Sequence, residues 1–151
     1  MKQCRLIILL FVLMLGIVGC TQNRGNIGDL FGSWVLEEMT ADGNTLPLPD
    51  NAEYATIAFQ GTVVRYTLHF GLHIYTNRVS TWTRSDNILS FDFTNGGHEI
   101  ETDGTFAPPY WLYFDEEIVT FVIAQLDKGH LTLVRNSKDG KTYVYKYLRT
   151  W

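Results

Sequence analysis

The chain has 151 residues, of which 46% are hydrophobic and 14% aromatic, and its formal net charge is −4. This length suits one globular domain rather than two. Because binding to nucleic acid depends on clustered lysine and arginine, the acidic balance predicts that nucleic acid is not a partner.

The first twenty residues have the pattern of a bacterial export signal. Lys2 and Arg5 precede an unbroken apolar run over 6–18, and small residues then lead to Cys20. Such a run is too short to remain as a membrane-spanning helix and is typical of a secretory signal. Its ending resembles the lipobox of bacterial lipoproteins, in which the cysteine is acylated and becomes the new N-terminus. We therefore expect a signal peptide over 1–19 and lipidation of Cys20; an ordinary cleaved signal or an uncleaved anchor is the alternative.

Lipidation would decide two chemical properties of the mature protein. Cys4 leaves with the signal and Cys20 carries lipid, so no thiol remains for a disulfide, a nucleophile or a metal site. Removal of Lys2 and Arg5 leaves ten basic against 16 acidic residues, a net charge of −6. Membrane attachment would then depend on the acyl chains, at about 0.8 kcal/mol per buried CH₂.

Residues 20–29 are polar, contain glycine and show no periodicity, which predicts a lipidated tether before a domain over 30–151. Fully extended, the tether reaches at most about 3.5 Å per residue, so the domain would stay within roughly 30 Å of the bilayer. Thr21, rather than aspartate, follows Cys20. By resemblance to lipoprotein sorting rules, this favours the outer membrane of the bacterial cell envelope, facing the periplasm.

From Leu30 onward the hydrophobic pattern predicts strands. No long window places apolar residues at i, i+3, i+4 and i+7, whereas alternation recurs and is clearest over 64–74. Turn-forming residues separate the segments. The expected strands are 31–40, 54–59, 64–74, 79–84, 88–94, 98–102, 118–126, 131–136 and 141–149. Eight to ten short strands without crossover helices predict an all-β, antiparallel up-and-down β-barrel, since closure hides both sheet edges.

The two ends of this strand series resemble the lipocalin-like domains of bacterial lipoproteins. Gly32 and Trp34 form the Gly-x-Trp of the first strand, and Arg149 stands where that family has a basic residue in the last strand. The resemblance implies that Arg149 lies over the Trp34 ring and plugs one barrel end, a cation–π contact worth about 0.5–2 kcal/mol. Two features depart from the family: the lipocalin disulfide cannot form, and the loop over 46–51 is short for a ligand lid.

The bulky face of the expected strands should point into the barrel and line any ligand cavity. The cavity candidates are Tyr66, Leu68, Phe70, Phe91, Phe93, Tyr143 and Tyr145. An eight-stranded barrel can be filled by its own side chains or can hold one small ligand. Large aromatic side chains favour a narrow or occupied interior.

The segment 106–114 has the most unusual composition in the chain. Pro108 and Pro109 exclude a central strand, so part of this aromatic segment must be a loop. It could be a portal at the barrel mouth, a sugar-stacking platform, a partner-docking patch or a cover for one barrel end. The portal candidates are Tyr110, Trp111 and Tyr113.

No motif predicts catalysis or metal binding, so we expect no enzyme, no cofactor and no metal. His69 and His73 fall on one face of the expected strand, but no further ligands accompany them, which indicates solvated side chains. The chain lacks a Gly-x-Ser-x-Gly elbow and a glycine-rich phosphate loop. Acidic residues of an expected charged outer face are Glu99, Glu101, Asp103, Asp115, Glu116 and Glu117.

The sequence therefore predicts a lipid-anchored, lipocalin-like protein that binds a small apolar or amphipathic ligand through the barrel interior and its aromatic mouth. The alternative is a packed barrel without a ligand that acts as an interaction or scaffold module through 106–114. An envelope hydrolase ranks third. An interior pocket of about 300 Å³ or more would favour the first hypothesis, and a solid interior would argue against it.

Overall fold

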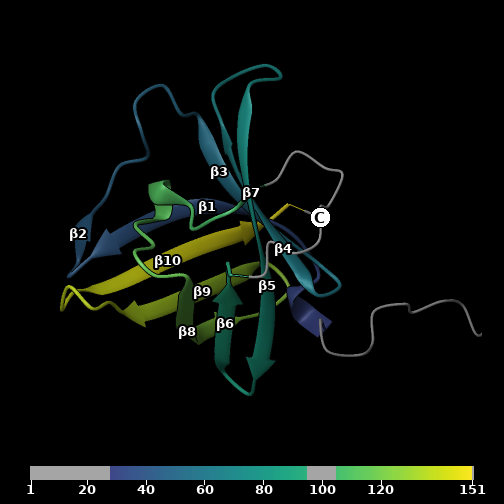
Figure 1. Cartoon of the computed structure of the whole chain (residues 1–151), viewed down its shortest axis with the longest axis vertical. Coiled ribbons are helices and arrows are strands. Elements are labelled where there is room, and N and C mark those ends of the chain that lie inside the picture. Colours follow the sequence, from purple (N-terminus) through teal and green to yellow (C-terminus); the bar gives the residue numbers. More distant parts are fainter. Residues whose placement is uncertain (1–27, 95–104, 151) are drawn as a thin grey trace, which may run out of the picture.

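Eight antiparallel strands follow one another around a closed barrel in the computed structural model, which describes residues 28–94 and 105–150 (Figure 1). In order around the wall they are β1 (Gly32–Ala41), β3 (Tyr54–Gln60), β4 (Val63–His69), β5 (Tyr75–Ser85), β6 (Ile88–Asp92), β8 (Ile118–Leu126), β9 (His130–Asn136) and β10 (Thr142–Arg149). Pairing of β10 with β1 closes the circle, and in Figure 1 the yellow β10 lies along the blue β1. The predicted all-β antiparallel barrel is confirmed.

Four short elements supplement the wall. β2 (Asn44–Thr45) pairs with the end of β1, and β7 (Thr105–Phe106) pairs with β5 in parallel, an addition to the expected up-and-down order. Two 3₁₀ helices complete the described elements, η1 (Gly28–Leu30) and η2 (Tyr110–Leu112). In the described ranges, no helix is long and apolar enough to cross a membrane. The expected strand 98–102 lies outside the described residues.

The single strand predicted over 64–74 is wrong, because the chain reverses inside it. β4 ends at His69, Gly71 has a φ of 124°, and β5 begins at Tyr75. The side chains expected on the buried face of this segment instead reach solvent: Leu72 is 90% and Ile74 63% exposed. The apolar alternation continues through the turn and therefore gave no sign of it. The chain can reverse there because glycine permits a positive φ that other residues rarely adopt.

Aromatic rings fill the centre of the barrel. Ring centroids lie 5.5 Å apart for Tyr66 and Phe91, 5.3 Å for Phe91 and Phe121, and 5.7 Å for Phe121 and Tyr145. These rings come from β4, β6, β8 and β10; β6 and β8 are neighbours in the wall, and the other two contacts each pass over one intervening strand. Separations of 4.5–7 Å, roughly, are those of packed aromatic pairs. Burial also raises the pKa of the Tyr66 and Tyr145 hydroxyls well above the ordinary tyrosine value.

One end of the barrel, here called the plug end, is closed by residues near the two ends of the described chain. Trp34 is buried, and its Nε1 donates a hydrogen bond to the carbonyl oxygen of Leu30 at 3.0 Å. The Arg149 guanidinium lies 4.4 Å from the Trp34 ring centroid and donates to the carbonyl oxygen of Asp29. The opposite end, where β1, β4 and β6 finish, is called the mouth.

Candidate functional site

The aromatic segment after β7 folds across the mouth. Pro109 precedes η2, and Tyr113 ends it with a left-handed φ of 57°. This one turn divides the portal candidates: Trp111 is buried with 2% exposure, whereas Tyr110 and Tyr113 are 57% and 39% exposed. Leu112 is also buried and joins the core cluster. The segment therefore covers the barrel with one face and presents two tyrosine rings to solvent with the other.

A buried arginine holds this segment in place. Arg135 lies on β9 at an inward position, and its Nη2 donates to the carbonyl oxygen of Tyr113 and to Asp115, each at 2.8 Å. Ser137 donates to the other oxygen of Asp115 at 3.0 Å. Burial raises the pKa of Asp115, but the hydrogen bonds from Arg135 and Ser137 outweigh it and leave that pKa below the ordinary value. The Tyr145 hydroxyl adds a 2.7 Å bond to the carbonyl oxygen of Leu112.

The guanidinium of Arg135 also contacts two aromatic rings. Its carbon lies 5.0 Å from the Tyr143 centroid and 5.5 Å from that of Phe114. Tyr113 in turn stacks on Tyr143, with centroids 6.2 Å apart. Sequence reasoning missed Arg135, although a signal was present: it continues the inward alternation of Leu131 and Leu133.

A hollow of about 390 Å³ lies between η2 and the proline-bearing loop that follows β2, and we call it the mouth hollow. Its lining residues are Pro47, Leu48, Pro49, Asp50, Tyr110, Trp111 and Tyr113. The rings of Tyr110 and Trp111 stand perpendicular, at 87°, with centroids 5.1 Å apart. All three portal candidates are thus brought together, in company with a loop that the sequence did not connect to them.

Two polar groups of the mouth hollow lack partners within the described residues. The Trp111 Nε1 atom is buried and forms no hydrogen bond. The Asp50 side chain is exposed, and none of the salt bridges or hydrogen bonds among the described residues involves its carboxylate. The lining therefore combines the Trp111 N–H and the Asp50 carboxylate with two tyrosine hydroxyls and a largely aromatic and proline wall.

The cavity candidates lie inside the barrel and do not line the mouth hollow or the hollow at the β4–β5 turn. Six of them are buried, and Phe70 is half-buried against the core. The rings of Phe93 and Tyr66 are 5.6 Å apart, and those of Tyr66 and Phe114 6.0 Å, so the mouth segment continues the same packing. The cavity candidates therefore pack against one another and against the mouth segment.

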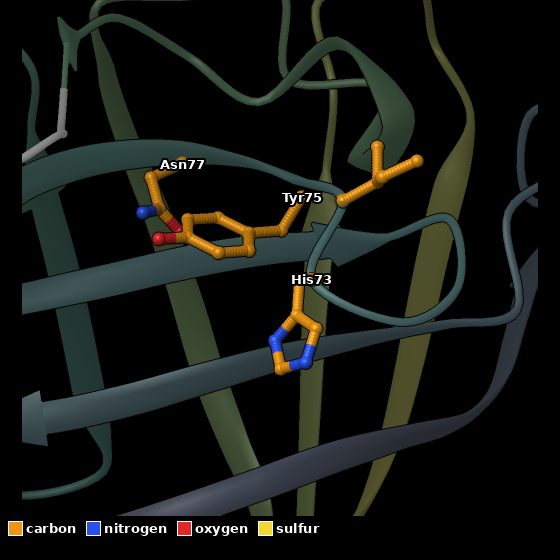
Figure 2. A pocket seen from close by; sticks show the side chains of 4 residues that line it. His73, Tyr75 and Asn77 are labelled. Atoms are coloured by element: carbon orange, nitrogen blue, oxygen red, sulfur yellow. The ribbon is translucent and has the colours of Figure 1, made fainter.

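A second hollow, also of about 390 Å³, lies at the β4–β5 turn and is lined by His73, Ile74, Tyr75 and Asn77 (Figure 2). Figure 2 shows the Tyr75 ring beside Asn77 and the His73 ring pointing away from both. Asn77 already accepts a hydrogen bond from Thr67 at 2.8 Å. This hollow is lined by an imidazole, a phenol and an amide, and unlike the mouth hollow its lining has no carboxylate.

The candidate histidines and acids that the structure describes do not assemble a metal site. His69 stacks on Tyr54 with centroids 4.1 Å apart, and burial lowers its pKa against the opposing effect of Glu53. Glu116 pairs with Lys138 at 2.9 Å. Within the described part of the chain, no three histidine, cysteine or acidic side chains are grouped to hold a metal. Glu99, Glu101 and Asp103 lie outside that part.

Comparison with known proteins agrees with this architecture. The family model described as a lipocalin-like domain matches residues 30–107. A lipocalin-like protein from Bacteroides uniformis has a similar structure, with a TM-score of 0.54 and 17% identity, covering 82% of this chain and all of that one. An uncharacterized protein from Bacteroides eggerthii gives a TM-score of 0.52 and 18% identity, covering 77% and 97%. No curated protein matches. Since the family model spans more than half of the sequence, the chain belongs to the lipocalin-like domain family.

Proposed function

We propose that this protein is a lipid-anchored component of the bacterial cell envelope that binds one small amphipathic ligand in the mouth hollow rather than inside the barrel. The observation that carries this proposal is the aromatic-walled hollow of about 390 Å³ at the mouth. Ligand pockets typically measure about 300–1,000 Å³ and combine apolar walls with a few polar groups. The mouth hollow is therefore sized for one small molecule.

Packing of the barrel centre supports this choice of site. Tyr66, Phe91, Phe121 and Tyr145 form a series of successive ring contacts inside the barrel. A ligand at that position would have to displace several buried rings, and removing one large core side chain alone costs about 3–5 kcal/mol. The exposed rings of the mouth are available without this penalty.

The unpaired N–H of Trp111 indicates that the ligand also carries a polar group. A buried donor without an acceptor costs about 1–3 kcal/mol. An oxygen of the ligand, or a water that enters with it, would recover that energy after a small side-chain shift, a common event on binding. The ligand we expect thus has an apolar body and at least one hydrogen-bond acceptor.

The proposed anchor leaves the hollow accessible. The described chain begins at Gly28 beside Leu30, which lies at the plug end, whereas Trp111 lies at the mouth. A tether from Cys20 would therefore join the barrel at the end opposite the hollow. The export pattern over 1–19 supports envelope localisation and acylation, and the residue after Cys20 supports the outer membrane.

The experiment is native mass spectrometry of the full chain, extracted from membranes, to detect a retained small molecule. We expect Tyr110→Leu to lose the molecule, because Tyr110 is exposed and walls the hollow. Tyr54→Leu is the matched control, since Tyr54 is similarly exposed but lies on β3 outside the hollow. Equal retention in both variants, or no retained molecule in the parent protein, would contradict the proposal.

A second candidate function, a docking module without a ligand, is favoured by the β4–β5 turn. Leu72 and Ile74 are more than half exposed, and Tyr75 is 48% exposed beside them. Exposed apolar patches mark interaction sites. Crosslinking to a partner in intact cells should then decrease in the Leu72→Ser and Ile74→Ser variants and be unchanged in Tyr110→Leu. The opposite result would exclude this alternative.

A further inference from the structure

We infer that the mouth hollow recognises an organic cation, so that the ligand carries a quaternary or protonated alkylammonium group. This inference rests on the proposed function and specifies the chemistry of the same site. Its basis is the combination, in one hollow, of aromatic walls with the Asp50 carboxylate, which has no partner among the described residues.

The aromatic walls have the composition that holds a cation. Tyr110, Trp111 and Tyr113 all line the hollow, and the first two rings meet at 87°. A cation is attracted to the electron-rich face of such rings within about 6 Å of the centroid, and sets of aromatic side chains of this kind bind quaternary ammonium groups. The rings that a cation can reach are those of Tyr110 and Tyr113, which are 57% and 39% exposed, whereas the buried Trp111 ring packs behind Tyr110.

The charge of the lining points in the same direction. Asp50 is the one ionisable acidic residue of the lining, and no lysine, arginine or histidine accompanies it. The guanidinium of Arg135, which donates to the carbonyl oxygen of Tyr113, is already paired with Asp115. The hollow therefore attracts cations and offers an anion no balancing charge. The acidic balance of the whole chain would add to this attraction over longer distances.

The unpaired indole N–H of Trp111 sets a second requirement for the ligand. Trp111 Nε1 is a donor and cannot contact the cation favourably. A ligand with an oxygen a few bonds from its ammonium group would satisfy both Trp111 and Asp50. Such a molecule is amphipathic, as the proposed function requires.

The test compares choline with 3,3-dimethyl-1-butanol, which has nearly the same shape and the same hydroxyl but no charge. Binding to the purified full chain is followed by NMR of the indole N–H groups, with Trp111→Phe assigning the signal of interest. We expect choline to bind about tenfold more tightly than the neutral probe. Asp50→Asn should remove most of that difference, and Tyr110→Leu should weaken both probes. Asp86→Asn is the control, because Asp86 lies in an exposed turn at the plug end.

Each outcome decides the inference. Preferential choline binding that depends on Asp50 and not on Asp86 supports it. Equal binding of the two probes, or an effect of Asp86→Asn as large as that of Asp50→Asn, overturns it. Absence of choline binding also overturns it; if a retained molecule still depends on Tyr110, the proposed ligand site stands, and if none does, both proposals fail.

Discussion

Replacing Arg135 with methionine should loosen the aromatic segment from the barrel while keeping the side-chain volume. The substitution removes the hydrogen bonds to the Tyr113 carbonyl and to Asp115, together with the ring contacts to Phe114 and Tyr143. Methionine retains an apolar stem that can pack where the arginine stem lay. The expected loss is therefore that of the charged contacts and not that of a cavity.

The magnitude follows from these contacts. Hydrogen bonds to a charged group contribute about 1.5–3 kcal/mol, and each cation–π contact adds about 0.5–1 kcal/mol. Asp115 is 43% exposed, so water can replace the lost hydrogen bond after the substitution. The contribution of the Arg135–Asp115 contact to stability is therefore at the low end of this range. We expect a decrease of about 3 kcal/mol in the free energy of unfolding, or about 12 °C in Tm for a domain of this size.

Thermal and urea unfolding of Arg135→Met, Asp115→Asn and the double variant measure this prediction. The two single effects should overlap by about 1–2 kcal/mol, because the residues share a contact. The effect of Asp115→Asn should also depend on pH. Since the folded pKa of Asp115 lies below its unfolded value of about 3.9, its stabilisation is present above that pH and is lost as pH falls through the folded pKa. A Tm decrease below about 4 °C for Arg135→Met would refute the anchoring role and leave apolar packing as its explanation.

Three further substitutions test other parts of the molecule. Arg149→Ala should lower stability by about 1–2 kcal/mol, because the contact with Trp34 is lost; an unchanged thermal midpoint would show that the contact does not stabilise the plug end. Burial raises the pKa of Tyr66 above its value in the unfolded chain. The folded state is therefore fully stabilised by the neutral hydroxyl below about pH 10, and this stabilisation decreases at higher pH. Tyr66→Phe should make unfolding less sensitive to pH between about 9 and 12, as followed by circular dichroism, and an identical pH profile would contradict this assignment. Cys20→Ser should release the protein from membranes, and continued sedimentation with them would count against acylation.

Much of the barrel could be predicted from local pattern, because alternation in a strand follows directly from which face is buried. The segments that became β3, β8 and β10 were predicted to within a residue or two at each end. The β4–β5 turn was missed, because Leu72 and Ile74 continue the alternation past the reversal. There the pattern reflects an exposed apolar turn and not a buried face.

The candidate site was predictable only in part, since it depends on contacts between distant segments. Pro108 and Pro109 predicted a loop, and the solvent-facing positions of Tyr110 and Tyr113 agree with it. No local pattern indicates that the loop through Pro49 meets η2, because that contact exists only once the barrel has closed. Arg135 was missed for a related reason. Its inward position could be inferred from the alternation, but its role depends on its contact with Asp115, a residue far away in the sequence.

The mouth hollow is built from two loops and not from the strands that close the barrel. One of them, through Pro47 and Asp50, lies within the part of the chain that the family model matches; the other, η2, begins at Tyr110, beyond the last matched residue, 107. Substitutions at the exposed residues of these loops, Asp50 and Tyr110, would therefore change the hollow and leave the rings that stabilise the wall in place. Members of this fold family could keep one barrel and differ in ligand, with selectivity and stability encoded in separate stretches of sequence.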